Sequence, residues 1–197
     1  MQANFLAIDP HKYGPDVAAL LESARLMELG PGQADRKLAD VRRRISLERL
    51  FPASTIADQD MALCCQAGLL LLHDFLDESH EVSQGIETTT GSYWHGIMHR
   101  REPDSSNAKY WFRRVGRHPV FGPLAEIVRE MLAGTELSQW KHLAAMRDRT
   151  EWDPMRFVDA CEAASGSDDA LCREIQACEW KLLFDYCYGQ ALGRRED

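Results

Sequence analysis

Apolar residues recur at helical spacing along almost the whole chain, and no stretch alternates apolar and polar residues as a half-buried strand does. The widest apolar stripes belong to two segments, 57–77 and 168–190. Because helices in proteins are stabilised mainly by packing of such stripes, we expect these two segments to form the centre of an all-α fold. The residues expected to be buried there are Leu69, Leu72, Leu76, Leu182, Leu183 and Tyr186.

Shorter apolar stripes and local start and stop signals predict the other helices. They run over about 17–29, 34–50, 93–101, 105–114, 123–133, 136–149 and 154–164. Asp104 or Ser105 can cap the fourth of these. The polar segment 79–91 is predicted to be a connection, whose first half can be helical. A chain of this length suits one core, so we expect residues 1–197 to form a single domain, a bundle of roughly seven to nine helices.

Composition and charge exclude several classes of function. Hydrophobic residues make up 45% of the chain and charged residues 27%, which is typical of a folded protein and not of a disordered one. The net charge of −8 disfavours binding to nucleic acid or to an anionic membrane. The most apolar run, 61–72, is shorter than the ~20 residues of a membrane-spanning helix. The sequence therefore predicts neither a nucleic-acid-binding protein nor a membrane protein.

The six cysteines and the first residues bear on the cellular compartment. No C-x-x-C pair occurs, and the start of the chain lacks the basic flank and apolar run of a secretory signal. We therefore expect reduced, mostly buried thiols in a cytoplasmic protein. A homodimer is expected only because twofold pairs are the commonest assemblies.

Residues 94–118, which we call the basic segment, differ from the rest of the chain and hold the candidate chemistry. The segment has six basic residues and two acidic ones, a net charge of +4 in a chain whose total is −8. It also holds three of the seven histidines and two of the five tryptophans. Such a segment needs either acidic partners within the fold or an external anion.

Histidine and carboxylate spacing in and before the basic segment is typical of a metal site. Two sets of residues follow i, i+4, i+7, so each set shares one helix face. The sets are His95, His99 and Glu102, and His73, Asp77 and His80. Their donor atoms suit zinc, iron or manganese, and a transition metal is the expected cofactor if the two faces meet in the bundle. In the structural alternative, these histidines extend buried stripes and orient neighbouring arginines.

The arginine and aromatic side chains of the basic segment are candidates for binding a small anion. An arginine fork fits a carboxylate or phosphate, and indole or phenol rings stack on planar groups. The candidate ligand-binding residues are Trp94, Arg100, Asn107, Tyr110, Trp111 and Arg114. In the structural alternative, the arginines pair instead with acids of the C-terminal helices, such as Asp159, Glu162, Glu179 and Asp185.

Two hypotheses about function remain open at this point. No G-x-S-x-G motif occurs, so the candidates for catalysis are general acid–base or metal-ligating groups, namely His95, His99 and Glu102. The first hypothesis is an enzyme in which a metal or a histidine assists a reaction on a small anionic molecule. The alternative is a noncatalytic helical module that binds a ligand or a protein, or uses the basic segment as a structural polar core. Whether the protein is an enzyme or a binding module, we expect its functional pocket to be lined by the basic segment.

Overall fold

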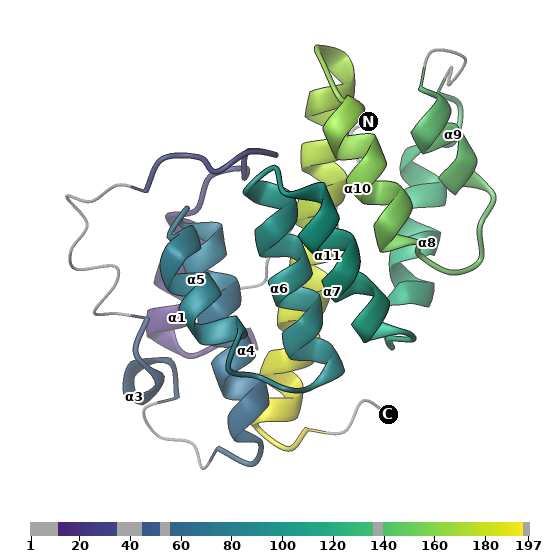
Figure 1. Ribbon diagram of the computed structural model, residues 1–197. Coiled ribbons are helices and arrows are strands. Elements are labelled where there is room, and N and C mark those ends of the chain that lie inside the picture. The colour runs from purple at the N-terminus through teal and green to yellow at the C-terminus, as the bar shows by residue number, and fades with distance from the viewer. Residues whose placement is uncertain (1–11, 35–44, 52–55, 136–139, 195–197) are drawn as a thin grey trace.

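The computed structural model describes residues 12–34, 45–51, 56–135 and 140–194. This part of the chain consists of packed helices and contains no strand (Figure 1). The all-α fold class predicted from the sequence is therefore confirmed. None of the described helices is both long and apolar enough to cross a lipid bilayer.

Ten helices lie in the described residues, and α11 matches the predicted helix 168–190. In chain order they are α1 (Pro15–Glu22), α3 (Leu47–Leu50), α4 (Gln59–Leu72), α5 (Leu76–Ser83), α6 (Thr89–Arg101), α7 (Ser105–Val115), α8 (Phe121–Met131), α9 (Lys141–Arg147), α10 (Pro154–Ala163) and α11 (Ser167–Ala191). The predicted helix 34–50 falls mainly outside the described residues, and α3 is its last turn. The predicted connection 79–91 contains the second half of α5 and the start of α6.

The predicted helix 57–77 is interrupted, and this part of the prediction was wrong. After α4 ends at Leu72, the chain turns at Asp74, whose φ of 64° lies in the left-handed region. The next helix, α5, then packs back against α4, and the Ser79 hydroxyl donates to the Ala67 carbonyl at 3.0 Å. The apolar stripe thus continues across a break that separates two antiparallel helices.

Arg101 at the end of α6 stabilises this break. Its Nη1 donates to the Leu71 carbonyl and its Nη2 to the Asp74 carboxylate, both at 2.5 Å. A cation at a helix C-terminus satisfies carbonyl groups that have no partner in the helix and interacts favourably with the negative end of the helix dipole. A Cβ on Gly32 would lie 2.3 Å from Cγ of Asp74, so the carboxylate occupies space that only glycine leaves open.

The most completely buried helix is α6, which lies between α4 and α5 on one side and α7 on another (Figure 1). Every residue from Thr90 to Arg101 is buried. The Thr88 hydroxyl caps this helix by accepting the N–H of Gly91 at 3.0 Å. The sequence placed 57–77 and 168–190 at the centre, and α4 and α11 do pack together. Many residues of α6 are polar, and they find their partners within the fold.

The predicted core residues are all withdrawn from solvent to some degree. Leu69, Leu76 and Leu183 are buried, whereas Leu72, Leu182 and Tyr186 are partly buried and pack against the core. The six cysteines all lie in the described part of the chain as free thiols, and five of them are buried. Most of the cysteines therefore serve as small apolar core residues.

Two glycines allow α6 to approach its neighbours closely. A Cβ on Gly68 of α4 would lie 2.7 Å from the ring of Trp94, and a Cβ on Gly96 would lie 2.7 Å from the ring of Phe112. Both rings are buried, so they have little room to move in a closely packed interior. The contacts of α6 with α4 and α7 therefore depend on the absence of a side chain at these two positions.

Replacing Gly96 by alanine should destabilise the protein by about 1–3 kcal/mol, because the ring of Phe112 must shift within a packed core. Gly189 on α11 provides the control, since a Cβ there meets no atom within 4 Å. Gly189→Ala should be neutral or stabilising, because alanine is the better helix former. Urea unfolding followed by circular dichroism measures both variants. Equal stability of the two would contradict the close α6–α7 contact.

Candidate functional site

Three histidines converge where α5 packs on α6, and we call them the histidine cluster. His80 lies on α5, and His95 and His99 lie one turn apart on α6. One nitrogen of each ring lies within 4.8 Å of the corresponding nitrogens of the other two. The centroid of the His80 ring is 4.8 Å from that of His95 and 5.1 Å from that of His99. Within the described residues, this is the group whose donor atoms lie close enough to share a metal ion.

Hydrogen bonding determines where the protons of the cluster lie. Nδ1 of His99 is 3.0 Å from Oε2 of Glu102, and since a carboxylate only accepts, Nδ1 carries the proton. The Nε2 atom of a neutral His99 then has a free lone pair, directed at Nε2 of His95 at 3.0 Å. Without a metal ion, His95 must therefore hold its proton on Nε2. This leaves its buried Nδ1 without a hydrogen-bond partner.

Burial keeps the two histidines on α6 neutral. It lowers the pKa of His95 to about 3. The neighbouring His99 and His80 lower this pKa further, whereas the backbone of Ser83 raises it by a smaller amount. Burial also lowers the pKa of His99, although the carboxylate of Glu102 acts in the opposite direction. Neutral imidazole is the form that binds metal ions, so near pH 7 protons do not compete for these two rings.

An aromatic wall supplied by α7 covers one side of the cluster. The ring of Trp111 stacks on that of His95 at 3.9 Å, with an angle of 15° between the planes. The exposed guanidinium of Arg114 lies 5.3 Å from the Trp111 ring and 6.0 Å from that of Tyr110. A positive charge therefore lies one aromatic ring away from the histidine cluster.

The structure brings together four of the six residues predicted as metal ligands. Three form the histidine cluster, and Glu102 joins it through His99. His73 ends α4 and Asp77 is exposed on α5, and neither belongs to the group. The break between α4 and α5 separates His73 from His80, because the i, i+4, i+7 rule holds only within one continuous helix.

Arg100, a candidate ligand-binding residue, belongs to a buried polar network. Its Nη2 donates to Oε2 of Glu179 at 2.5 Å. The other oxygen of Glu179 accepts from the Tyr93 hydroxyl at 3.0 Å and from the Trp152 indole at 3.1 Å. The side chains of this ion pair are 1% and 0% exposed, so the charges neutralise each other in the interior. For this arginine, the geometry favours the structural alternative that the sequence left open.

The remaining candidates divide between structural and surface positions. Trp94 is fully buried, and its indole N–H donates to Sγ of Cys187 at 3.4 Å. Asn107 interacts with Asp104, whose carboxylate caps α7 and is one of the two caps that the sequence allowed. Tyr110 is 46% exposed. Trp94 and Asn107 therefore support the fold, whereas α7 presents aromatic and basic groups near the histidine cluster.

Sequence reasoning missed several polar partners because they are distant along the chain. Tyr93 and Trp152 lie 86 and 27 residues from the glutamate that they both contact. Asp74 lies 27 residues from Arg101. No rule of local spacing connects such positions. The only signal was general, namely that buried arginines need acidic partners.

His118, the third histidine of the basic segment, has a structural role. Its Nδ1 lies 3.4 Å from the N–H of Val120, and its Nε2 lies 3.2 Å from the Thr90 hydroxyl. The ring packs edge-on against Tyr93 and Tyr186. Burial lowers its pKa to about 4.

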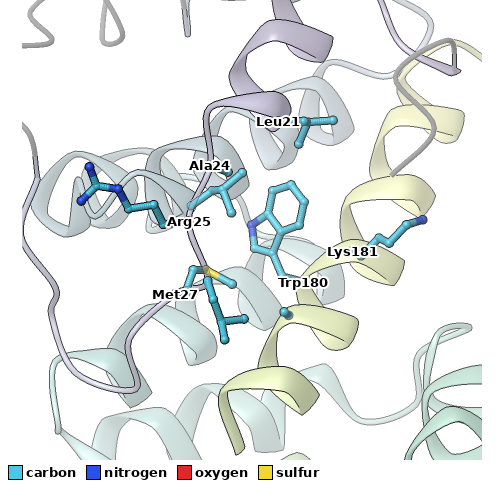
Figure 2. Close-up of a pocket in the computed structure, with 9 residues that line it drawn as sticks. Leu21, Ala24, Arg25, Met27, Trp180 and Lys181 are labelled. Atoms are coloured by element: carbon cyan, nitrogen blue, oxygen red, sulfur yellow. The ribbon is translucent and has the colours of Figure 1, made fainter. Parts of the chain in front are cut away.

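Cavities occur away from the histidine cluster. Figure 2 shows one of about 200 Å³ beside α11, bordered by Met27 and Trp180, with Arg25 and Lys181 pointing away from it. Its lining is mainly apolar and contains none of the candidate site residues. Another cavity, of about 190 Å³, reaches the basic segment at Arg100.

Comparison with known proteins adds no assignment, since no family model, curated protein or solved structure matches the chain. The described residues themselves define an all-helical protein with a buried core of histidine, arginine and tryptophan side chains. Three of these histidines are placed so that they could hold a metal ion.

The metal-free protein should lose stability as the pH falls from 7 to 5. An unfolded histidine takes up a proton with a pKa of about 6.5, whereas His118 in the folded protein does so only near 4. Below pH 6.5 the unfolded state therefore binds more protons and is favoured. His118 alone should lower the free energy of unfolding by about 1–2 kcal/mol over this range. Urea unfolding at a series of pH values measures how the free energy of unfolding changes with pH.

The variant His118→Gln isolates this effect. Glutamine keeps a polar amide at the position but does not titrate, so the variant should show a smaller loss of stability between pH 7 and 5. If the variant and the parent protein lose stability in parallel, His118 is not the group responsible.

Proposed function

We propose that His80, His95 and His99 bind one divalent transition-metal ion, and that the protein is an enzyme in which this ion assists a reaction on a small anionic molecule. The convergence of three imidazole nitrogens within 4.8 Å is the observation that carries the proposal. Two nitrogens bound to one zinc ion lie about 3.3 Å apart at the tetrahedral angle, because each Zn–N bond is about 2.0–2.1 Å. The 3.0 Å between Nε2 of His95 and Nε2 of His99 is close to that separation.

The type of donor supports a catalytic rather than a structural ion. Structural zinc sites are closed by four protein ligands, often cysteines, whereas catalytic sites use three protein ligands and leave a position for water or substrate. The cluster has three imidazoles and no thiolate. Imidazole suits zinc as well as copper, iron and nickel, and zinc is the ion to test first.

Glu102 supports the proposal as a group that orients a ligand. Histidines that bind metal ions usually donate their other ring N–H to a carboxylate or carbonyl, which fixes the tautomer and makes the ligating nitrogen more basic. His99 has this arrangement with Glu102. In the metal-bound form His95 would move its proton to Nδ1, the nitrogen that otherwise has no partner.

The proposed chemistry is activation of a bound water molecule or polarisation of a bound carbonyl. An ion held by three neutral imidazoles keeps its positive charge, and zinc in such a site lowers the pKa of its water to about 7. The exposed charge of Arg114 near Trp111 supports an anionic substrate, because it attracts negative charge to this side of the cluster. Trp111 limits access of solvent to His95 from that side.

A second candidate function is a noncatalytic module in which the basic segment is a structural polar core. The observations that favour it are the pairing of Arg100 with Glu179 and of Arg101 with Asp74. These pairs account for two arginines of the segment, but they do not involve the histidine cluster.

Zinc titration of the purified, chelator-treated protein tests the proposal. The parent protein should bind about one ion per chain, since the cluster supplies ligands for one. His99→Ala and His80→Ala should weaken the affinity by more than about 100-fold, because each removes one of three ligands. Glu102→Gln should weaken it by about 10–100-fold, as is typical for a group that orients a ligand.

The control is His142→Ala, which removes an exposed histidine on α9 and should leave zinc affinity unchanged. Circular dichroism establishes that each variant is folded. Zinc affinity that is equal in the parent, His99→Ala and His80→Ala would refute the metal site and leave the noncatalytic module as the better account.

A further inference from the structure

The cavity of about 200 Å³ shown in Figure 2 lies between the segment after α1, the end of α4 and the middle of α11. Ala24 and Leu26 border it from the segment after α1, Leu72 from the end of α4, and Ala177 and Trp180 from α11. Apolar groups from three parts of the chain therefore meet here without filling the space between them.

Hydrogen bonds from α11 hold the walls of this cavity in place. Arg173 donates from Nε to the Met27 carbonyl at 3.0 Å and from Nη2 to the Leu26 carbonyl at 3.1 Å. Gln176, three residues further along α11, donates to the Glu28 carbonyl at 3.0 Å. Closing the segment over the cavity would break these bonds. The cavity is therefore formed before a ligand binds, which lowers the cost of binding.

Apolar surface at the rim of the cavity is in contact with solvent. Leu26 is 39% exposed and is one of three exposed large hydrophobic side chains among the described residues. Ala24 and Leu72 are partly buried. The indole N–H of Trp180 donates to the Gly68 carbonyl at 2.8 Å, so this ring offers the cavity only apolar surface. A ligand that is apolar where it meets these walls would remove their exposed surface from water, which is favourable.

The charged side chains that line the cavity, Arg25 and Lys181, are both basic. They lie on opposite sides of it and point away from its apolar interior (Figure 2). Arg25 is exposed and has no ion-pair partner among the described residues. Lys181 and Lys12 share the carboxylate of Asp185, at 2.8 and 3.5 Å, so two ammonium groups face one carboxylate there. Positive charge around an apolar interior favours a ligand with an apolar body and a negatively charged end.

We propose that this cavity binds the alkyl chain of a medium-chain monocarboxylate. The chain packs between the segment after α1 and α11, and the carboxylate stays at the mouth in contact with water, where the exposed side chain of Arg25 turns toward it. An apolar cavity of about 150 Å³ holds the six carbons of benzene, so about 200 Å³ suits a chain of about six to eight carbons. A flexible chain fits walls built mainly from leucine, alanine and methionine side chains.

This site is independent of the proposed metal site. None of the residues that line the cavity belongs to the histidine cluster or to the basic segment. Failure of one proposal therefore does not affect the other.

Titration with sodium hexanoate at constant ionic strength, observed by nuclear magnetic resonance of the tryptophan indole N–H groups, tests the inference. The signal of Trp180, which borders the cavity, should shift saturably, whereas that of Trp140, which borders a different cavity, should not. From butanoate through pentanoate to hexanoate the affinity should rise about fourfold per methylene, because each methylene adds a similar area of buried apolar surface. Hexan-1-ol has the same chain without the charge and should bind more weakly than hexanoate.

Two pairs of variants locate the site. Ala24→Leu places a larger side chain in the wall and should weaken hexanoate binding by about tenfold or more. Ala144→Leu makes the same change at a partly buried alanine of α9 that does not line the cavity, and should bind hexanoate as the parent does. Arg25→Gln removes an exposed charge and should weaken binding of hexanoate by about two- to fivefold without affecting hexan-1-ol. Arg129→Gln removes an exposed charge on α8 and should affect neither.

Saturable binding at Trp180 that strengthens with chain length and with the carboxylate supports the inference. Affinity that does not depend on chain length overturns it, as does equal hexanoate affinity in Ala24→Leu and Ala144→Leu. Hexan-1-ol that binds as tightly as hexanoate also overturns it, because the cavity would then take neutral apolar molecules. A shift of Trp140 in place of Trp180 would mean binding elsewhere and has the same consequence. If Ala24→Leu does not fold, the chain-length series on the parent protein and Arg25→Gln decide.

Discussion

The buried guanidinium of Arg101 holds together the part of the structure on which the candidate site depends. It donates to the last turn of α4 through the Leu71 carbonyl, to the carboxylate of Asp74, and to the Gly30 carbonyl at 3.2 Å. These bonds fix the point at which α4 stops and α5 turns back. Because α5 turns back there, His80 lies beside α6 and not beyond the end of a continuous helix.

Burial of the polar helix α6 sets the second constraint. A charged or polar group in the interior must be paired there. The polar residues on different faces of α6 find different partners. Arg100 pairs with Glu179 on α11, whereas His95 and His99 face each other and α5. Gly96 brings α7 close enough for its rings to pack against α6. One helix thus supports the structural network and the histidine cluster at the same time.

The sequence predicted those features that depend on local spacing. Helical periodicity indicated the all-α fold, and the i, i+4 relation of His95 and His99, with Glu102 three residues later, survives in the structure. His80 lies beside His95 and His99 for a reason that the sequence did not indicate, since a continuous helix would have grouped it with His73. The break at Asp74 could not be predicted, because the side chain that stabilises it comes from another helix. The partners of buried arginines are likewise set by packing, which periodicity does not encode.

The central claim is that the imidazoles of His80, His95 and His99 form a metal site with an open position. A crystal structure of the zinc-treated protein, with anomalous scattering recorded on both sides of the zinc absorption edge, tests it most directly. The account predicts one strong anomalous peak within about 2.0–2.1 Å of a nitrogen of each of the three rings, with a water molecule or buffer anion as the fourth ligand. The absence of a peak at this position, or a peak only at surface residues, would contradict it.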